Sequence, residues 1–469
     1  MSGDTTELTQ PSDFWTADRV AEALGPLLRQ SAKPSAQRFA RVWSDTRTLR
    51  EGDLFVALSG ERFDAHSFVA DAVRAGARGV VVSNPAAAAE LAVPVYEVPD
   101  TRVALGALGT YRRRQWRGTV VGVVGTNGKT STKELLRAAL GSRRRVHATH
   151  GNLNNLVGVP QTLLAIPHDA EVAVIEMGTN QPGEVATLRA IAEPDVVVVT
   201  SIAEEHLEGL GDLAGVMREE LSAADGVGVV VVPASQPDVV AEARGRARTV
   251  VAAGLDEGDL RATDWSLGAD GSGEVTVAGT PVRVPLRGVH NLRNAMLAIA
   301  VARELGIGLE DVARGIGAMT APPMRSNVEA VGRVLLINDA YNSNPGSARA
   351  ALELLAHAGG PEARGRQRVA VLGTMLELGP TAPALHDEIA RSALDAGIDL
   401  VAGVGEYGEA LRRIGAPPER CLAAPDAEAI WPALSSRLAP DAIILLKGSR
   451  GVRLERLVPL IQQWVRTAP

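Results

Sequence analysis

The sequence predicts an α/β protein of three domains: a small N-terminal α/β domain at 1–116, a central parallel-sheet domain at 117–320 and a C-terminal Rossmann-like domain at 321–469. The length of 469 residues is about three times the ~150 residues of a typical domain. Short β-branched runs that do not alternate with polar residues recur at helix-length spacing in two parts of the chain. Such runs are typical of parallel strands that are buried on both faces.

The N-terminal domain shows mixed signals that indicate a small α/β fold. The periodicity predicts a helix near 17–28 and an apolar strand at 79–82, with further structured segments at 53–58 and 68–75. We therefore expect one small sheet with helices packed on it before residue 116.

The central and C-terminal domains each show a regular alternation of strands and helices. In the central domain we expect parallel strands at 119–124, 172–176, 196–200 and 227–232, a hairpin within the turn-rich segment 234–286, and a helix at 290–305. In the C-terminal domain we expect strands at 334–338, 369–372, 400–404 and 442–446. Polar and unusual residues follow many of these strands, and open parallel sheets bind ligands at the carboxyl ends of their strands.

Composition excludes several classes of protein. Hydrophobic residues make up 46% of the chain, so several cores can form, and the net charge of -7 argues against a nucleic-acid binder. The start of the chain does not resemble a secretory signal, and no apolar run approaches the ~20 residues of a membrane span. We expect no membrane insertion and a cytoplasmic location. The single cysteine, Cys421, excludes an internal disulfide and a cysteine-rich metal site.

Lysine is rare in this chain. Only Lys33, Lys129, Lys133 and Lys447 occur among 48 basic residues, so the other 44 are arginines. Where arginine fills most cationic positions, a remaining lysine is a candidate for a function that needs a compact ammonium group.

The first strong motif is a phosphate-binding loop between the strand at 119–124 and the next predicted helix. Glycines let backbone N–H groups approach phosphates, the start of the helix adds positive potential, Lys129 reaches the outer phosphates and Thr130 can hold Mg²⁺. The pattern is not perfect, because Val123 occupies the position of the first glycine of the usual motif. The candidate ATP-binding residues here are Gly125, Thr126, Asn127, Gly128, Lys129, Thr130 and Ser131. Lys133, one turn further on, is expected to be solvated.

Several further motifs follow in order along the chain: GNLNNLVGVP from Gly151, EMGTNQPGE from Glu176, AEEHLEGLGDLAGV from Ala203, GVHNLRNA from Gly288, then NDAYNSNP, MLELG and KGSRG. Together with GTNGKTSTKE and the N-terminal segment SDTRTLREGDLFVALSGERFDAH, they resemble the Mur ligases over nearly the whole chain. This resemblance implies that the N-terminal domain binds a UDP-linked substrate, that the central domain is a P-loop ATPase-like domain and that the C-terminal domain is the ligase domain.

The resemblance also implies an activity. A ligase of this family transfers the γ-phosphate of ATP to a substrate carboxylate, and an amine then displaces the phosphate from the acyl phosphate. The substrates implied are UDP-N-acetylmuramoyl-tripeptide and D-alanyl-D-alanine, with ATP and Mg²⁺ as cofactors, and we expect a monomer. The sequence does not show whether the third residue of the tripeptide is lysine or diaminopimelate.

The resemblance assigns the catalytic residues to Lys129, Glu176, His206 and Arg325, and the metal ligands to Thr130, Glu176 and His206. Glu176 ends one strand and His206 follows the next, so both can face the phosphate loop. A glutamate at a strand end or a lone histidine is also commonly structural.

The third acidic metal position departs from the family pattern. Family members usually carry a carbamylated lysine fourteen residues after the histidine, and this chain has Glu220 there. At 100° per residue Glu220 lies on the apolar face of its helix, whereas Glu219 does not. We interpret Glu220 as a direct replacement for the carbamate. The alternative is an inward residue that pairs with an arginine such as Arg218.

The remaining candidate residues are assigned mainly through the resemblance. Asn291, Asn294 and Arg325 would meet the nucleotide, although asparagines near helix starts are often caps. Asp339, Tyr341 and Asn342 would contact the ATP ribose and base, although an ordinary asparagine-rich turn is the simpler reading. The candidate substrate-binding residues are Ser44, Thr46, Arg47, Asn154, Asn155 and Lys447. His357, His386 and Arg143 to Arg145 are expected to have packing or surface functions.

Two other hypotheses remain open. The chain could be another amide ligase with the same ATP chemistry, such as a folylpolyglutamate synthase, although the N-terminal segment and DAYNSNP disfavour this. It could also be a nucleotide-binding relative with impaired catalysis, because Glu220 replaces the usual lysine and Thr374 occupies a usually acidic position.

Overall fold

The computed structural model describes residues 10, 13–29, 36–60, 63–268, 270–320 and 327–467. The chain divides into two compact units. One comprises Met1–Val123, Arg144–Thr179 and Gly183–Val197, and the other comprises Val124–Arg143, Asn180–Pro182 and Val198–Pro469. No helix in the described part of the chain combines the length and the hydropathy that a bilayer-spanning helix needs.

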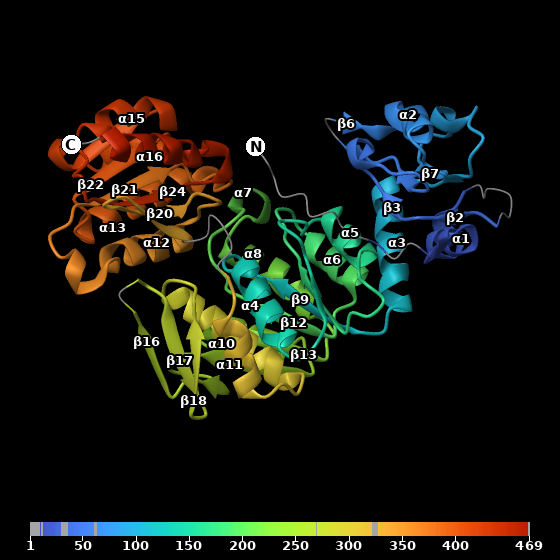
Figure 1. The fold of residues 1–469 in the computed structure, drawn as a ribbon, viewed down its shortest axis with the longest axis horizontal. Coiled ribbons are helices and arrows are strands. Elements are labelled where there is room, and N and C mark those ends of the chain that lie inside the picture. The colour runs from blue at the N-terminus through green and yellow to red at the C-terminus, as the bar shows by residue number, and fades with distance from the viewer. Residues whose placement is uncertain are drawn as a thin grey trace. The chain divides into compact units, whose positions relative to one another are not determined.

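The N-terminal α/β domain contains a four-stranded parallel sheet in the order β3-β4-β7-β8. Two of its strands, β3 and β7, are labelled in Figure 1. Its strands are β3 (Val42–Trp43), β4 (Leu54–Val56), β7 (Gly79–Val82) and β8 (Val95–Glu97), and its helices are α1 (Ala17–Leu24), α2 (Val69–Arg74) and α3 (Thr101–Gln115). Short pairs also form between β1 (Trp15–Thr16) and β2 (Arg38–Phe39) and between β5 (Ser59–Gly60) and β6 (Phe63–Asp64). The predicted small α/β fold is confirmed.

The central domain contains a seven-stranded sheet in the order β10-β11-β9-β12-β13-β14-β15. The strands are β9 (Thr119–Val124), β10 (Val146–Ala148), β11 (Val172–Glu176), β12 (Val196–Val199), β13 (Val229–Pro233), β14 (Thr249–Gly254) and β15 (Leu260–Arg261). The helices that alternate with them are α4 (Lys129–Gly141), α5 (Gly158–Leu164), α6 (Glu184–Ala192), α7 (Leu207–Leu210), α8 (Leu213–Leu221) and α9 (Pro237–Arg244). The unalternated valine runs are buried along their length, as the sequence predicted.

The segment 234–286, predicted to be a turn-rich hairpin, differs from its prediction. Its first part forms α9 and then β14 and β15 of the seven-stranded sheet. Its second part follows β15. Instead of a hairpin it forms a three-stranded antiparallel sheet of β16 (Asp264–Leu267), β17 (Gly273–Val277) and β18 (Thr280–Val284). The first strand was missed because β16 is exposed along most of its length and so lacks an apolar run. Helices α10 (Val289–Glu304) and α11 (Leu309–Gly317) follow, and both pack against α4.

The C-terminal domain contains a six-stranded sheet in the order β19-β20-β24-β21-β22-β23. Its strands are β19 (Asn327–Val331), β20 (Val334–Asp339), β21 (Arg368–Gly373), β22 (Leu400–Val404), β23 (Cys421–Ala424) and β24 (Ile443–Lys447), and only β19 runs antiparallel to its neighbour. The helices are α12 (Pro345–His357), α13 (Ala382–Asp395), α14 (Glu406–Arg413), α15 (Ala427–Ser435) and α16 (Leu457–Thr467). The doubly wound fold is confirmed.

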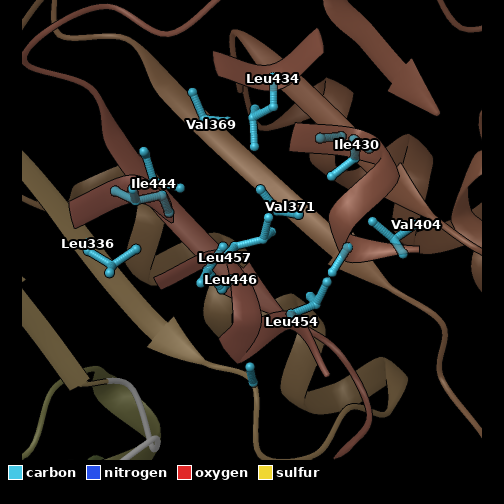
Figure 2. Close-up of a cluster of buried hydrophobic side chains, with 14 of the residues drawn as sticks. Leu336, Val369, Val371, Val404, Ile430, Leu434, Ile444, Leu446, Leu454 and Leu457 are labelled. Atoms are coloured by element: carbon cyan, nitrogen blue, oxygen red, sulfur yellow. The ribbon is translucent and has the colours of Figure 1, made fainter. Parts of the chain in front are cut away.

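A buried aliphatic cluster holds this sheet rigid. Leu336, Val371 and Leu446 come from three adjacent strands and meet Leu454 and Leu457 from the segment that begins α16 (Figure 2). Close packing of this kind fixes the strand ends to within small displacements. The loops that leave β20, β24 and β21 therefore start from a rigid edge, and they carry DAYNSNP, KGSRG and GTMLELG.

Candidate active site

The phosphate loop leaves β9 and enters α4 through two glycines in the left-handed region. Gly125 has φ +117° and Gly128 has φ +86°. A Cβ atom on Gly125 would lie 2.5 Å from Thr200 Oγ1, and one on Gly128 would lie 2.8 Å from Asn294 Nδ2. Both backbone conformation and close packing therefore require glycine at these positions.

The tip of the loop is held in place by its neighbours. Thr126 Oγ1 accepts a hydrogen bond from the Ala203 N–H at 3.0 Å, and the Asn127 N–H donates to Ser201 Oγ at 3.1 Å. Lys129 Nζ donates to the carbonyls of Gly125 and Thr126. The lysine thus lies across the loop, where its ammonium group can neutralise a bound phosphate.

Glu220 from α8 lies directly against this loop. Its carboxylate is 2% exposed, and Oε2 accepts a hydrogen bond from the Gly125 N–H at 2.7 Å. Burial raises the pKa of Glu220, and the Lys129 charge and the Gly125 N–H offset only part of this rise. The inward position predicted from helix periodicity is confirmed.

The alternative reading of Glu220 is wrong, because Gly125 is its partner and Arg218 is exposed. Glu219, which the helical wheel places off the apolar face, is buried too, at 8% exposure. The helical wheel places the two side chains on different faces, but neighbouring elements cover both of them.

Glu176 ends β11, where it is 2% exposed. Its Oε1 accepts a hydrogen bond from Asn154 Nδ2 at 2.9 Å, and its N–H donates to Thr149 Oγ1 at 2.9 Å. Asn154, predicted to bind substrate, therefore orients the Glu176 carboxylate in this structure. Asn155 Oδ1 accepts from the N–H groups of Val157 and Gly158, so Asn155 is bonded to the backbone just before α5.

His206 lies at the start of α7 with a left-handed backbone, φ +54°. Its Nδ1 is hydrogen-bonded to the Glu377 carboxylate, and its Nε2 lies 3.8 Å from Glu205 Oε1. Burial lowers the pKa of His206, but the hydrogen bond to Glu377 and the charge of Glu205 outweigh burial, so the pKa lies above its ordinary value. The same hydrogen bond lowers the pKa of Glu377.

The loop after β20 meets the phosphate loop through amide side chains. Asn127 and Asn344 exchange hydrogen bonds at 3.1 Å and 2.8 Å. Asn342 Nδ2 donates to Glu205 Oε1 at 3.0 Å. Lys447 Nζ forms an ion pair with Asp339 at 2.8 Å and donates to the Asn342 carbonyl at 2.7 Å. In this structure Lys447 neutralises Asp339 and supports the loop that carries Asn342.

A cavity of about 130 Å³ lies where these loops come together. Its lining includes the carboxylates of Glu205 and Glu377 and the imidazole of His206, and Ser449 and Arg450 contribute a hydroxyl and a cation. The remaining lining residues are Asn342, Ser343, Asn344, Leu376, Leu378 and Gly451. The cavity therefore offers groups of both charges and two leucine side chains.

Asn291 and Asn294 share one face of α10, as predicted. Asn294 Nδ2 donates to Asn291 Oδ1 at 3.2 Å, and Asn291 Nδ2 donates to the Arg287 carbonyl at 2.8 Å. Neither side chain caps the helix, whose N-cap is Gly288. Since Asn294 also packs against Gly128, this pair belongs to the surroundings of the phosphate loop.

Among the candidate residues of the N-terminal domain, Ser44 contacts α5, whereas Thr46 and Arg47 are engaged locally. Ser44 Oγ accepts from Gln161 Nε2 at 3.0 Å. Thr46 begins a short 3₁₀ turn capped by Asp45, and the same carboxylate pairs with Arg47, whose side chain is 86% exposed.

Three candidate residues of the other domains differ in burial. Tyr341 is half-buried, and Ser131 is buried in α4 while Thr130 is half-buried. Arg325 lies outside the described residues.

Two expectations about other residues are corrected or refined. Lys133 is 1% exposed and pairs with Glu134 at 3.1 Å, so it is not solvated. The reason is that α10 and α11 pack on α4 and cover it. His386 is fully buried and its Nε2 accepts from the Met375 N–H at 2.9 Å, which makes it a packing residue that holds the MLELG loop.

Glu176, His206 and Glu220 remain the predicted acidic and imidazole metal ligands. Within the described residues, no three His, Cys, Asp or Glu side chains lie close enough together to hold a metal ion. Sequence reasoning also missed Glu205, Asn344 and Glu377. Glu205 stands directly before His206 in AEEHLEG, Asn344 lies in NDAYNSNP and Glu377 lies in MLELG. Membership of these motifs was therefore the signal that could have identified them.

Comparison with known proteins agrees with this geometry. Residues 123–302 match the Mur ligase middle domain, and residues 324–450 match the Mur ligase glutamate ligase domain. The chain is 35% identical to the UDP-N-acetylmuramoyl-tripeptide–D-alanyl-D-alanine ligase of Escherichia coli, over 90% of this chain and 93% of the relative. It is 34% identical to the Bacillus subtilis ligase of the same name, over 89% and 92%.

Solved structures give the same result. The crystal structure of MurF from Acinetobacter baumannii aligns with a TM-score of 0.87 at 30% identity, covering 97% of this chain and 100% of that one. MurF from Thermotoga maritima in complex with ADP aligns with a TM-score of 0.78 at 28% identity, covering 92% and 98%. A folylpolyglutamate synthase from Yersinia pestis, at 20% identity and a TM-score of 0.56, shares the fold alone.

The structure thus has the mixed α/β, three-domain architecture of these ligases, with a phosphate loop in the middle domain and a Rossmann-like C-terminal domain. On sequence identity over nearly the full length, the chain belongs to the Mur ligase family.

Proposed function

We propose that this protein is an ATP-dependent, ADP-forming ligase that joins D-alanyl-D-alanine to UDP-N-acetylmuramoyl-tripeptide in peptidoglycan precursor synthesis. The observation that carries the proposal is the match to ligases of this activity over about nine tenths of the chain. Because the match includes the N-terminal domain, it extends to the part of the molecule that would bind the UDP-linked substrate. We propose domain limits at 116 and 320, between that domain, the ATP-binding domain and the ligase domain.

The nucleotide would bind on the phosphate loop. Gly128 lies at the start of α4 and Lys129 lies across the loop, so the helix N-terminus and the ammonium group can both act on the triphosphate. Asn294 beside Gly128 supports a role for α10 in nucleotide binding. We keep Asp339, Tyr341 and Asn342 as the ribose and base contacts and Arg325 as a phosphate contact, each as a proposal.

Magnesium would bind between the protein and the phosphates. Carboxylate and hydroxyl oxygens suit Mg²⁺, and a buried carboxylate whose pKa is raised by burial, such as Glu220, is stabilised by a nearby cation. Mg²⁺ usually binds through one or two carboxylates together with substrate phosphates and water, so a preassembled cage of protein ligands is not needed. We propose Thr130, Glu176, His206 and Glu220 as the residues that would hold it. The ion would neutralise charge during phosphoryl transfer.

The amine substrate would bind in the 130 Å³ cavity. A dipeptide with an amino group and a carboxylate needs both charges opposite it, and the cavity lining includes the carboxylate of Glu205 and the guanidinium of Arg450. Leu376 and Leu378 offer apolar surface for small side chains such as methyl groups. The volume is below the ~300 Å³ at which sites for drug-sized ligands begin.

The UDP-linked substrate would use the N-terminal domain together with the loop before α5. We propose Ser44, Thr46 and Arg47 as contacts, with Asn154 and Asn155. Arg47 is largely exposed and can turn from Asp45 to a diphosphate. We propose Lys447 as a further substrate contact. Its ammonium group would leave its ion pair with Asp339 and bind a phosphate or carboxylate of the substrate.

The decisive experiment measures phosphate release by the purified protein with ATP, Mg²⁺ and each substrate. We expect release only when both UDP-N-acetylmuramoyl-tripeptide and D-alanyl-D-alanine are present, and formation of the pentapeptide by mass spectrometry. Tripeptides with lysine and with diaminopimelate at the third position should be compared. Release with a folate and glutamate instead would contradict the proposal, and ATP binding without release would indicate the impaired relative. A monomeric state and a cytoplasmic location remain predictions.

A further inference from the structure

The contact between His206 and Glu377 joins two segments that are 171 residues apart in the sequence. His206 has φ +54° and Glu377 has φ +64°, and they are two of the five non-glycine residues with positive φ in the described part of the chain. Non-glycine residues adopt this conformation only where their surroundings hold them, and such residues cluster at functional sites. Here two of them are bonded to each other.

The backbone confirms that this is a defined docking contact. The Glu208 N–H donates to the Glu377 carbonyl at 3.2 Å, next to the side-chain bond. Gly379 also approaches Glu208, since a Cβ atom on Gly379 would lie 3.4 Å from Glu208 Cα. The MLELG loop therefore meets the start of α7 through a side chain, a main-chain bond and close packing.

The loop that presents Glu377 is itself fixed from the C-terminal domain. The Met375 N–H donates to His386 Nε2 at 2.9 Å, and the Leu376 N–H donates to Ser449 Oγ at 3.0 Å. Thr374 Oγ1 accepts from the Glu406 N–H at 3.0 Å. His386 is fully buried and Ser449 is 4% exposed, so the Glu377 carboxylate is held on a rigid support.

The chemistry of the bond determines the state of the imidazole. An ionised carboxylate can only accept hydrogen bonds, so the proton between the two residues belongs to His206 Nδ1. Nε2 is then the nitrogen that lies 3.8 Å from Glu205 Oε1, and both residues line the cavity. Carboxylates that bind the far nitrogen of a histidine fix its tautomer and the direction of its ring.

We propose that Glu377 of the C-terminal domain is the positioning residue for His206 of the central domain, so that the histidine is correctly oriented only while the MLELG loop is docked on α7. This deepens the proposed function and depends on it for the assignment of His206 to the catalytic site. On this proposal the MLELG loop, the KGSRG loop and His386 have one structural role in common, because His386 and Ser449 hold the loop that carries the Glu377 carboxylate.

The test compares Glu377→Ala and Glu377→Gln with the wild-type protein and with Glu208→Ala as a control. Glu208 is an exposed glutamate in the same contact, and its backbone N–H is retained in alanine. Each full-length protein is labelled with ¹⁵N-histidine, and the imidazole nitrogens of His206 are recorded without ligands at pH 8.5. A His206→Gln spectrum assigns the signals. Ligase kinetics and thermal unfolding are measured on the same samples.

We expect His206 to carry its proton on Nδ1 in the wild type, in Glu208→Ala and in Glu377→Gln, because the glutamine oxygen can still accept. Glu377→Ala should shift the proton toward Nε2 and lower kcat about tenfold to hundredfold, with the KM for ATP changed less than about threefold. Glu377→Gln should retain most of the activity, within about threefold of wild type.

Unchanged His206 nitrogen signals and unchanged kcat in Glu377→Ala would overturn the proposal. A folded Glu377→Gln protein with a kcat as low as that of Glu377→Ala would also overturn the proposal. An oxygen that accepts the hydrogen bond from His206 Nδ1 would then not be enough to keep the histidine active. If Glu377→Ala does not fold, Glu377→Asp replaces it: the shorter carboxylate should lose the Nδ1 proton and kcat in the same way. A wild-type protein without ligase activity would refute the proposed function, while the NMR comparison would still decide whether Glu377 orients His206.

Discussion

Glu220 shows how a single buried charge can serve a site at a cost in stability. The carboxylate is nearly inaccessible, and its hydrogen bond from the Gly125 N–H compensates only part of the lost hydration. Burial accordingly raises the pKa of Glu220 above the ordinary value of 4.5. A group whose folded pKa is raised favours folding at low pH, and its contribution is lost as pH rises through that raised value.

We therefore predict that Glu220→Gln separates stability from activity. The amide oxygen can keep the bond from Gly125, and the neutral side chain removes the buried charge, so stability at pH 7.5 should rise by roughly 1 kcal/mol. Phosphate release should fall by roughly 100-fold, because one charged oxygen is removed from the proposed metal site. Urea unfolding and the phosphate assay check this. Full activity with an unchanged Mg²⁺ requirement would exclude Glu220 as a ligand.

Sequence reasoning was most successful at residues whose role depends on a local pattern. The phosphate loop follows from its glycines and lysine, and the inward position of Glu220 follows from helical periodicity. Glu377 and Asn344 could not be assigned in the same way, because each acts on a segment that is 171 or 217 residues away. Lys133 was misassigned since its burial depends on α10 and α11, which come more than a hundred residues later.

At the scale of the element, Asn344 connects a helix start to the phosphate loop. It caps α12 by accepting from the Ser347 N–H at 2.9 Å, and Ser347 Oγ accepts from the Asn344 N–H at 3.0 Å in return. Its amide also pairs with Asn127. The cap orients the side chain, so the same amide satisfies the helix start and meets the phosphate loop.

We predict that Asn344→Ala destabilises the protein by about 0.5 to 2 kcal/mol, the usual range for loss of a cap. Asn127→Ala should cost less, because the cap remains. The double variant should be less stable than Asn344→Ala by at most a few tenths of a kcal/mol. The reason is that Asn344→Ala alone already removes the hydrogen bonds between Asn127 and Asn344. Chemical denaturation of the four proteins measures these values. Additive losses would show that the two amides act independently.

The MLELG loop depends on a histidine that must stay neutral. His386 Nε2 accepts from the Met375 N–H, and Nδ1 donates to the Ala382 carbonyl at 2.7 Å. Burial lowers the pKa of His386 from its ordinary value of 6.5, although the bond to Ala382 counteracts this in part. Below pH 6.5 the unfolded chain therefore binds a proton that the folded chain does not.

We predict that stability falls as pH decreases from 6.5 toward the lowered folded pKa of His386, by up to about 1.4 kcal/mol per pH unit from this group. His386→Gln can keep both hydrogen bonds and has no charge to gain, so its stability should fall less steeply over the same interval. Urea unfolding of the two proteins between pH 7.5 and 5.5 measures the difference. Parallel profiles would mean that His386 does not control this dependence.

The elements themselves were largely predictable from hydrophobic periodicity. Several strand limits agree to the residue, among them Val172–Glu176 and Leu400–Val404, because parallel strands buried on both faces leave a distinct apolar run. The exposed strand Asp264–Leu267 leaves no such run, and it became visible only through its pairing with β17.

At the scale of the whole molecule, nucleotide binding should be measurable as stability. A ligand that binds only the folded protein raises its stability by about 2.7 kcal/mol at 100 times its Kd. We predict that Mg-ATP raises the unfolding temperature of the wild type, and that Lys129→Ala reduces this rise because the loop loses its cation. Arg137→Ala, an exposed substitution on the same helix, should respond as the wild type does. Equal shifts in all three proteins would place the nucleotide elsewhere.

The scarcity of lysine has a practical consequence for chemical labelling. Lys133 and Lys447 are 1% and 3% exposed, whereas Lys129 is half-buried at the phosphate loop. Among the lysines of the described residues, Lys129 is therefore the one that an amine-reactive reagent can reach. An acylating reagent that carries a nucleotide should then modify this site selectively, and peptide mapping after such labelling would report its occupancy in a cell extract.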